Sequence, residues 1–380
     1  MNEMQEKRRR TMALLLTPFA GAEAMAATPS SAVDLAVRRP AAAFMADRRA
    51  VGLSLGVIHA GATGSYHFGT VDKTRVQVAN ERTIYPIASL TKTFTGLLLA
   101  QAQLAGKLKL DDDIRKYLVG DYPNLAFEGQ PILVHHLVNH VSGLPRLLPD
   151  SPEAAPDFQS TVPYADRLRA LVAASTPASF EEALHRVKLT APPGTRFSYS
   201  NAAAQLAGHI LERVEGMSFE ALVRERIAQP LGMRDTFIKP TAGQVVRLVS
   251  GYEESVPQPY FPDQMQAAGA LKSTLSDMLA YARWQLAERD PAVRLTHQPQ
   301  DHAGGYVAGL NWQLVAKGAR RVIFQDGSQP GFCCLLVLHP DSATAVVVLA
   351  NEIDRDAMGR LRTLANGVVA ALADSALPVP

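Results

Sequence analysis

Two short groups of residues could together perform nucleophilic chemistry, and the first is Ser89-Leu-Thr-Lys92. It runs into an apolar stretch, TFTGLLLA, which predicts a helix over 91–104. Three residues apart at a helix N-terminus, the serine and the lysine share a face, and the amine comes within reach of the hydroxyl. A serine hydroxyl is a weak nucleophile until a neighbouring base takes its proton. The spacing therefore predicts an activated serine, with a helix cap beside a solvated lysine as the simpler alternative.

The second group is Tyr199-Ser200-Asn201, which follows the turn PPGT and precedes the helical run AAAQLAGHILERVEG. A tyrosine facing the serine and lysine could relay the proton to a leaving group, and an asparagine could fix the lysine while contacting a substrate amide. The simpler alternative for Tyr199 is an aromatic core residue at the start of a helix. A rival group, Tyr122-Pro123-Asn124, contains a proline and lies in a loop without a helix to hold it, so we prefer Tyr199.

Two other patterns are weaker. Gly52-Leu-Ser54-Leu-Gly56 matches the nucleophile elbow of α/β-hydrolases, but the elbow needs a helix directly after it and the next residues, VIHAGATGS, continue a strand into a turn. His136 and His140 are spaced like zinc ligands on a helix, yet the glutamate of the metalloprotease motif is missing between them. We interpret both histidines as structural, and we expect neither a metal nor a cofactor.

The chain that must position these residues begins and ends with strands. Residues 51–59 and 65–69 predict a hairpin, and 321–325, 331–339 and 344–350 predict three more strands before a helix at 355–373. Between them the pattern is mostly helical, over 91–104, 165–174, 202–214, 219–227 and 276–288. The simplest assembly is an α/β (α+β) fold in which the first and last strands form one antiparallel sheet flanked by helices. A discontinuous sheet lobe (27–90 and 305–380) and a mainly helical lobe (91–304) would then enclose a cleft, the expected site.

Longer strings resemble a known family. They are IASLTKTFTGLLLAQAQLAGKLKLDDDI at 87–114, LVNHVSGLP at 137–145, PPGTRFSYSN at 192–201, PLGMRDTF at 230–237, GALKSTLSDM at 269–278 and GLNW at 309–312. They resemble the penicillin-recognising serine hydrolases: class C β-lactamases, low-molecular-weight DD-peptidases and esterases of the β-lactamase fold. The resemblance is close to the DD-carboxypeptidase/endopeptidase branch. It implies a β-lactamase/transpeptidase-like fold, Ser89 as nucleophile, Lys92 and Tyr199 as acid/base groups, and Asn201 as a positioning residue.

The third motif of this family is altered. Where relatives usually carry Lys-Thr-Gly or His-x-Gly, this chain has Gln325-Asp326-Gly327. In the family the positive side chain helps to hold a substrate carboxylate, whereas here a carboxylate would meet the like charge of Asp326. We therefore expect neutral or amine-bearing substrates. The oxyanion hole resembles a pair of backbone N–H groups, those of Ser89 and Ser328, which tolerate side-chain changes if Gly327 keeps its conformation.

Composition excludes several other classes. The 380 residues include 38 basic and 36 acidic ones, and a net charge of +2 is too small for nucleic-acid binding. The two cysteines, Cys333 and Cys334, are adjacent and cannot easily bridge each other. Basic residues at 7–10, an apolar run at 11–22 and small residues at 24–26 predict a cleavable signal peptide over 1–26, exported by the Sec or the Tat route.

The sequence therefore predicts a periplasmic or secreted serine hydrolase, without a transmembrane segment in its mature chain, that works through an acyl-enzyme on Ser89. Its substrate would be a small ester or amide, or a peptidoglycan-like peptide. Whether Lys92 or Tyr199 is the first base stays open. The alternatives are a DD-carboxypeptidase/endopeptidase or β-lactamase of class C type, and a non-catalytic descendant that binds peptidoglycan fragments or a protein.

Overall fold

The computed structural model describes residues 32–75, 77–149, 163–303, 306–372 and 376–380. These residues belong to one compact unit, Ala32–Pro380. The predicted signal peptide, 1–26, lies outside the described residues.

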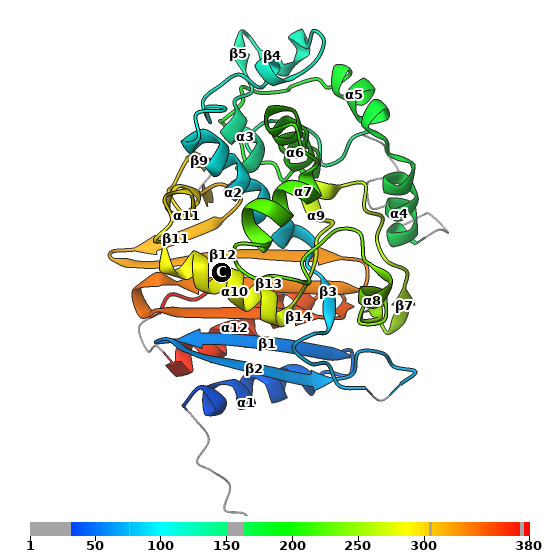
Figure 1. Ribbon diagram of the computed structural model, residues 1–380, viewed down its shortest axis with the longest axis vertical. Helices are drawn as coiled ribbons and strands as arrows, with labels where there is room; N and C mark the ends of the chain where they lie inside the picture. Colours follow the sequence, from blue (N-terminus) through cyan, green and yellow to red (C-terminus); the bar gives the residue numbers. More distant parts are fainter. Residues whose placement is uncertain (1–31, 76, 150–162, 304–305, 373–375) are drawn as a thin grey trace, which may run out of the picture. The chain divides into compact units, whose positions relative to one another are not determined.

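The largest element is an antiparallel sheet of eight strands in the order β2-β1-β14-β13-β12-β11-β10-β9 (Figure 1). As predicted, its centre joins the beginning and the end of the sequence, since Gly56 of β1 pairs with Val347 of β14. The strand bounds are β1 Gly52–His59, β2 Ala62–Gly69, β9 Asp301–Ala303, β10 Tyr306–Ala308, β11 Gln313–Lys317, β12 Arg320–Gln329, β13 Phe332–His339 and β14 Thr344–Ala350.

Both faces of the central strands are buried. β13 and β14 consist mainly of Leu, Val, Cys and Ala and have no exposed position, which is typical of strands covered on both sides. One face packs against α1 (Ala32–Met45) and α12 (Ala357–Leu372), and the other against α10 (Leu275–Ala287). In Figure 1, α10 crosses in front of the sheet and α12 lies behind it.

Most of the remaining helices lie on the β12 side of the sheet (Figure 1). The two that matter most for the site are α2 (Thr91–Leu104), almost wholly buried, and α6 (Asn201–Glu215). Ser200 caps α6 by accepting the N–H of Ala203, and Gly216 ends it in the left-handed conformation. The shorter helices are α3 Val134–Val138, α4 Tyr164–Ala174, α5 Pro177–His185, α7 Phe219–Val223, α8 Ala242–Val245, α9 Gln266–Gly269 and α11 Pro291–Thr296.

Small sheets and turns complete the fold. A two-stranded sheet pairs β3 with β8, and two others are formed by β4 with β5 and by β6 with β7 and β15. Their bounds are β3 Ile84–Pro86, β4 Ala126–Phe127, β5 Gln130–Pro131, β6 Gly251–Glu253, β7 Val256–Gln258, β8 Lys272–Thr274 and β15 Glu352–Ile353. Because β3 ends three residues before Ser89, its pairing with β8 fixes the approach of the chain to that serine.

The predicted fold class is confirmed, with small differences in element bounds. The helix 91–104 and the strand 344–350 are found with the predicted bounds. β2 begins at Ala62 instead of residue 65, and the helix expected over 219–227 changes to a π-helical turn from Arg224. The division into lobes at 90 and 305 stays a prediction; α10, from the helical stretch, packs on the sheet. No helix within the described ranges is long and apolar enough to cross a bilayer.

Candidate active site

Ser89 and Lys92 lie where β3 runs into α2. Ser89 is in a short 3₁₀ turn, Ala88–Leu90, that continues directly into the helix. This turn places Lys92 Nζ 3.0 Å from Ser89 Oγ, as the spacing predicted. Ala88 adopts the left-handed conformation with φ of 42°, which is uncommon for a residue with a side chain. The backbone is thus strained directly before the serine, as often found at functional sites.

Lys92 is fully buried, so the alternative of a solvated lysine is wrong. Its Nζ donates to Ser89 Oγ, to Asn201 Oδ1 at 2.8 Å and to the backbone carbonyl of Ala268 at 2.6 Å. None of these acceptors carries a full negative charge. Burial lowers the pKa of Lys92, Tyr199 opposes this shift, and the positive charge of Arg146 lowers the pKa further. A lysine in these surroundings releases its own proton more readily and can then accept one from Ser89.

Tyr199 lies beside both the serine and the lysine. Its Oη lies 2.7 Å from Ser89 Oγ, and its ring centre is 5.0 Å from Lys92 Nζ. Asn201 is the first residue of α6, and its backbone N–H donates to the carbonyl of Arg146 at 2.9 Å. The structure therefore brings together all four residues of the two sequence motifs, with Ser89 Oγ between two proton-carrying groups.

His140 packs against the ring of Tyr199. It is buried, its ring lies 4.4 Å from that of Tyr199, and its Nδ1 accepts the N–H of Ser200 at 3.2 Å. Burial and the nearby charge of Lys92 lower the pKa of His140 to about 3, so the imidazole is neutral at ordinary pH. His136 Nδ1 accepts the N–H of Leu133. Over the part of the chain that the structure describes, no cluster of three metal-binding side chains exists.

The third motif lies on β12, which is longer than predicted and includes residues 325–329. Gln325 is buried, and its Oε1 accepts from Gln313 Nε2 at 3.1 Å. Gly327 packs directly against Ser89, because a Cβ there would lie 2.8 Å from the backbone nitrogen of Ser89. Only glycine allows this approach, and the next residue, Ser328, borders the same cavity as Ser89.

Asp326 requires a correction. From the sequence, its charge is expected to repel a substrate carboxylate. Its Oδ2 instead accepts from Arg362 Nη2 of α12 at 2.6 Å, and both side chains are only partly exposed. A guanidinium this close compensates the negative charge, so the assumption of an unopposed anion beside the substrate is wrong.

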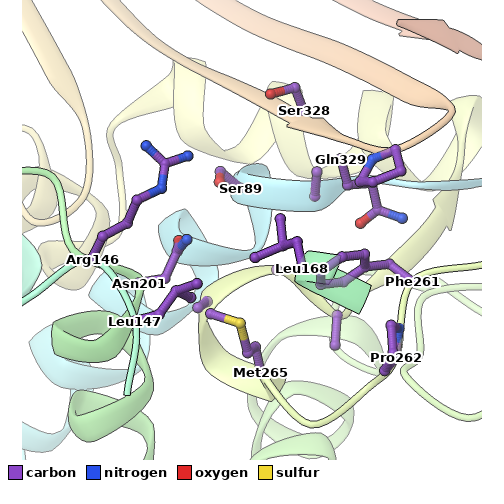
Figure 2. A pocket seen from close by; sticks show the side chains of 15 residues that line it. Ser89, Arg146, Leu147, Leu168, Asn201, Phe261, Pro262, Met265, Ser328 and Gln329 are labelled. Carbon is purple, nitrogen blue, oxygen red and sulfur yellow. The ribbon is translucent and has the colours of Figure 1, made fainter. Parts of the chain in front are cut away.

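A cavity of about 90 Å³ opens beside Ser89. Figure 2 shows Ser89, Arg146 and Asn201 bordering it with Ser328 from β12 and a group of apolar side chains. The lining residues are Ala88, Ser89, Arg146, Leu147, Leu168, Asn201, Phe261, Pro262, Met265, Ala268, Gly269, Ala270, Ser328, Gln329 and Pro330.

The rival motifs have structural partners elsewhere. Ser54 is buried on β1, where its Oγ lies 2.9 Å from both His67 Nδ1 and Tyr85 Oη. β2 follows it instead of a helix, which excludes a nucleophile elbow. Asn124 donates to the carbonyls of Leu184 and Val187 and thus holds a loop.

Sequence reasoning missed Arg146 and the Ala268 carbonyl. Arg146 directly follows the string LVNHVSGLP, so its place beside a motif was a usable signal. The Ala268 carbonyl could not be found in this way, because every residue has one. Arg362, the partner of Asp326, lies 36 residues further along the chain.

Comparison with known proteins agrees with this geometry. The family model described as "Beta-lactamase" matches residues 37–370. The chain belongs to the beta-lactamase family. It is 25% identical to the beta-lactamase of Escherichia coli K12 over 374 residues, covering 86% of this chain and 90% of that protein. It is 27% identical to the D-alanyl-D-alanine-carboxypeptidase/endopeptidase AmpH of the same strain, covering 74% of each chain.

The solved structures extend the likeness to the fold. The beta-lactamase/D-alanine carboxypeptidase of Yersinia pestis superposes with a TM-score of 0.76 at 24% identity, over 91% of this chain and 99% of that one. The family resemblance found in the sequence is thereby confirmed, and the protein is a serine hydrolase of the beta-lactamase family.

Proposed function

We propose that the protein hydrolyses esters or amides through an acyl-enzyme on Ser89. The observation that supports this most directly is the position of Ser89 Oγ, 3.0 Å from Lys92 Nζ and 2.7 Å from Tyr199 Oη. A hydroxyl held between two groups that can exchange protons is arranged for nucleophilic attack. A non-catalytic descendant would have no need to keep a lysine buried among neutral acceptors, because burying a charge is costly.

In the first half of the reaction, Lys92 Nζ takes the proton of Ser89 while Ser89 Oγ bonds to the substrate carbonyl carbon. The carbonyl oxygen becomes an oxyanion that accepts hydrogen bonds from the backbone N–H groups of Ser89 and Ser328. When this intermediate collapses, the bond to the leaving group breaks and Tyr199 Oη protonates the departing atom. Lys92 then returns a proton to Tyr199, which leaves the acyl-enzyme with its acid/base groups restored.

Water completes the cycle. It gives a proton to the Tyr199 and Lys92 pair and bonds to the acyl carbon, which forms a second oxyanion. The bond from that carbon to Ser89 Oγ then breaks, and the serine recovers its proton. Asn201 keeps Lys92 in place through the 2.8 Å hydrogen bond and borders the cavity, where its amide can contact the substrate.

The test combines turnover with covalent labelling. We expect Ser89→Ala to lose hydrolysis of 4-nitrophenyl acetate and labelling by a fluorophosphonate probe, while its thermal unfolding stays close to wild type because little packing is removed. Ser54→Ala, at the rival serine, should keep the label. Wild-type turnover in Ser89→Ala would show that the nucleophile is another residue.

Only one of the two grounds for neutral or amine-bearing substrates holds. Gln325 is uncharged and hydrogen-bonded to Gln313, but Asp326 is compensated by Arg362. The names of the relatives point to β-lactams and to peptides ending in D-alanyl-D-alanine as substrates to test. Either would carry a carboxylate into a cleft whose third motif offers no cation.

We also propose export to the periplasm or the medium. The support is the basic, apolar and small-residue order of residues 1–26. N-terminal sequencing of protein from its native host should give a start near Ala27 in a fraction outside the cytoplasm. An intact Met1 in the cytosolic fraction would contradict export.

A further inference from the structure

The cleft contains a cation that no sequence motif of the family supplies. Among the described residues that line the cavity, Arg146 is the one with a cationic side chain, because Lys92 lies beneath Ser89 and is fully buried. Arg146 comes from the loop that follows α3 and borders the cavity together with Ser89 and Asn201 (Figure 2).

The backbone of Arg146 is fixed by hydrogen bonds, and its side chain is exposed. Its carbonyl accepts the N–H groups of Asn201 at 2.9 Å and Ala202 at 3.3 Å, which fixes it to the start of α6. The guanidinium carbon lies 5.9 Å from the ring centre of Tyr199. Within the described ranges, no carboxylate is close enough to form an ion pair with it. An exposed arginine beside the reactive serine, with no ion pair to a described carboxylate, is suited to an anionic ligand.

We propose that Arg146 binds a carboxylate on the leaving group of the substrate and so replaces the cation missing from the third motif. This inference rests on the proposed function. The leaving group is favoured over the acyl group because Tyr199, which protonates the departing atom, is the aromatic ring that Arg146 contacts. A planar guanidinium can hold a carboxylate with two parallel hydrogen bonds. Asp326 does not oppose such a substrate, because its charge is paired with Arg362.

The experiment compares two substrates that differ by one charge. They are 3-acetoxybenzoate, which carries a carboxylate on its leaving group, and the methyl ester of the same compound. The readout is the ratio of their kcat/KM values in wild type, Arg146→Ala and Arg146→Lys. We expect the ratio to fall about 10- to 100-fold in Arg146→Ala and by less in Arg146→Lys, which keeps the charge and loses the two-pronged geometry.

Arg186→Ala is the matched control, because it removes one exposed arginine at the C-terminal end of α5. Its ratio should equal that of wild type. A second substrate pair, 4-nitrophenyl hydrogen adipate and its methyl ester, carries the charge on the acyl side. If Arg146→Ala lowers only this second ratio, the leaving-group assignment is overturned. If neither ratio changes by more than twofold, Arg146 binds no carboxylate.

A binding measurement separates this inference from the proposed function. In Ser89→Ala, which cannot turn the ester over, calorimetry should show 3-acetoxybenzoate binding at least tenfold more tightly than its methyl ester. Adding Arg146→Ala should remove the difference. If the wild type has no esterase activity but Ser89→Ala binds 3-acetoxybenzoate tightly through Arg146, only the catalytic proposal is refuted. Equal affinities of the two compounds in Ser89→Ala would refute the role of Arg146.

Discussion

Gly327 offers the sharpest test of the catalytic geometry, through the substitution Gly327→Ala. A Cβ at this position would lie 2.8 Å from the backbone nitrogen of Ser89, 2.8 Å from Cys334 Sγ and 3.0 Å from the carbonyl oxygen of Ile87. Two of these three atoms belong to the backbone, so no side-chain rotation relieves the contacts.

The magnitude follows from the distances. The backbone near Ser89 must move by at least about 0.6 Å to reach the 3.4 Å at which ordinary contacts begin. Oxyanion-hole donors work at about 2.7–3.1 Å from the oxyanion, so this movement takes one of the two N–H groups out of range. Loss of one such donor lowers kcat by about 10²- to 10³-fold. Overpacking of this kind costs roughly 1–3 kcal/mol of stability.

The assay is hydrolysis of 4-nitrophenyl acetate, together with urea unfolding to establish that the variant is folded at the assay temperature. Gly359→Ala is the matched control, because a Cβ on this exposed residue of α12 meets nothing within 4 Å. It should gain roughly 0.5–1 kcal/mol in stability and keep its turnover. A folded Gly327→Ala variant with wild-type kcat would refute the assignment of the oxyanion hole to the N–H groups of Ser89 and Ser328.

Three further results are expected. Lys92→Met and Tyr199→Phe should each lower kcat by about 10²-fold or more, and the double variant should be little worse than either, because both residues move the same proton; additive losses would show that they act independently. His140 has a pKa of about 3 in the folded protein and about 6.5 in the unfolded chain, so between pH 7 and pH 5 it binds a proton only in the unfolded chain. In urea unfolding, the wild type should therefore lose about 2 kcal/mol more stability over this pH range than His140→Asn does. Equal losses would contradict a buried neutral imidazole. Arg362→Ala should lower kcat/KM for 3-acetoxybenzoate about 5-fold by exposing the charge of Asp326, and Asp326→Asn in the same chain should restore it, whereas no recovery would show that the pair does not influence the cleft.

Local patterns in the sequence were sufficient to single out the two motifs that meet at Ser89. The three-residue spacing of Ser89 and Lys92 corresponds to about one turn of helix. The apolar run after them predicts a helix that packs against the core. Tyr199 and Asn201 were found because a turn and a capped helix surround them. In each case the information lies within a few residues of the functional side chain.

The charge of the cleft could not be found in this way. Asp326 acquires its partner from α12, and Arg146 reaches the cavity because its carbonyl is anchored to α6. Both contacts depend on how distant elements pack, and no periodicity along the chain records them. The premise of an unpaired charge on Asp326 failed for this reason. The preference for neutral or amine-bearing substrates and the role of Ser89 as nucleophile stay predictions.

The pairing of β1 with β14 has a consequence for the order of events during synthesis. Gly56 can pair only after Val347 has been synthesised. Ser89 likewise lacks its neighbour Gly327, which is about 240 residues further along the chain, until that residue has been added. Closing loops of this length adds little to the equilibrium cost but slows folding, because distant contacts must form before they stabilise anything. A nascent chain that has passed Tyr199 therefore carries the serine, the lysine and the tyrosine without the strand that completes the oxyanion hole. The chain therefore stays inactive until β12 has joined the sheet. A polypeptide exported in the unfolded state would become active only after it has crossed the membrane.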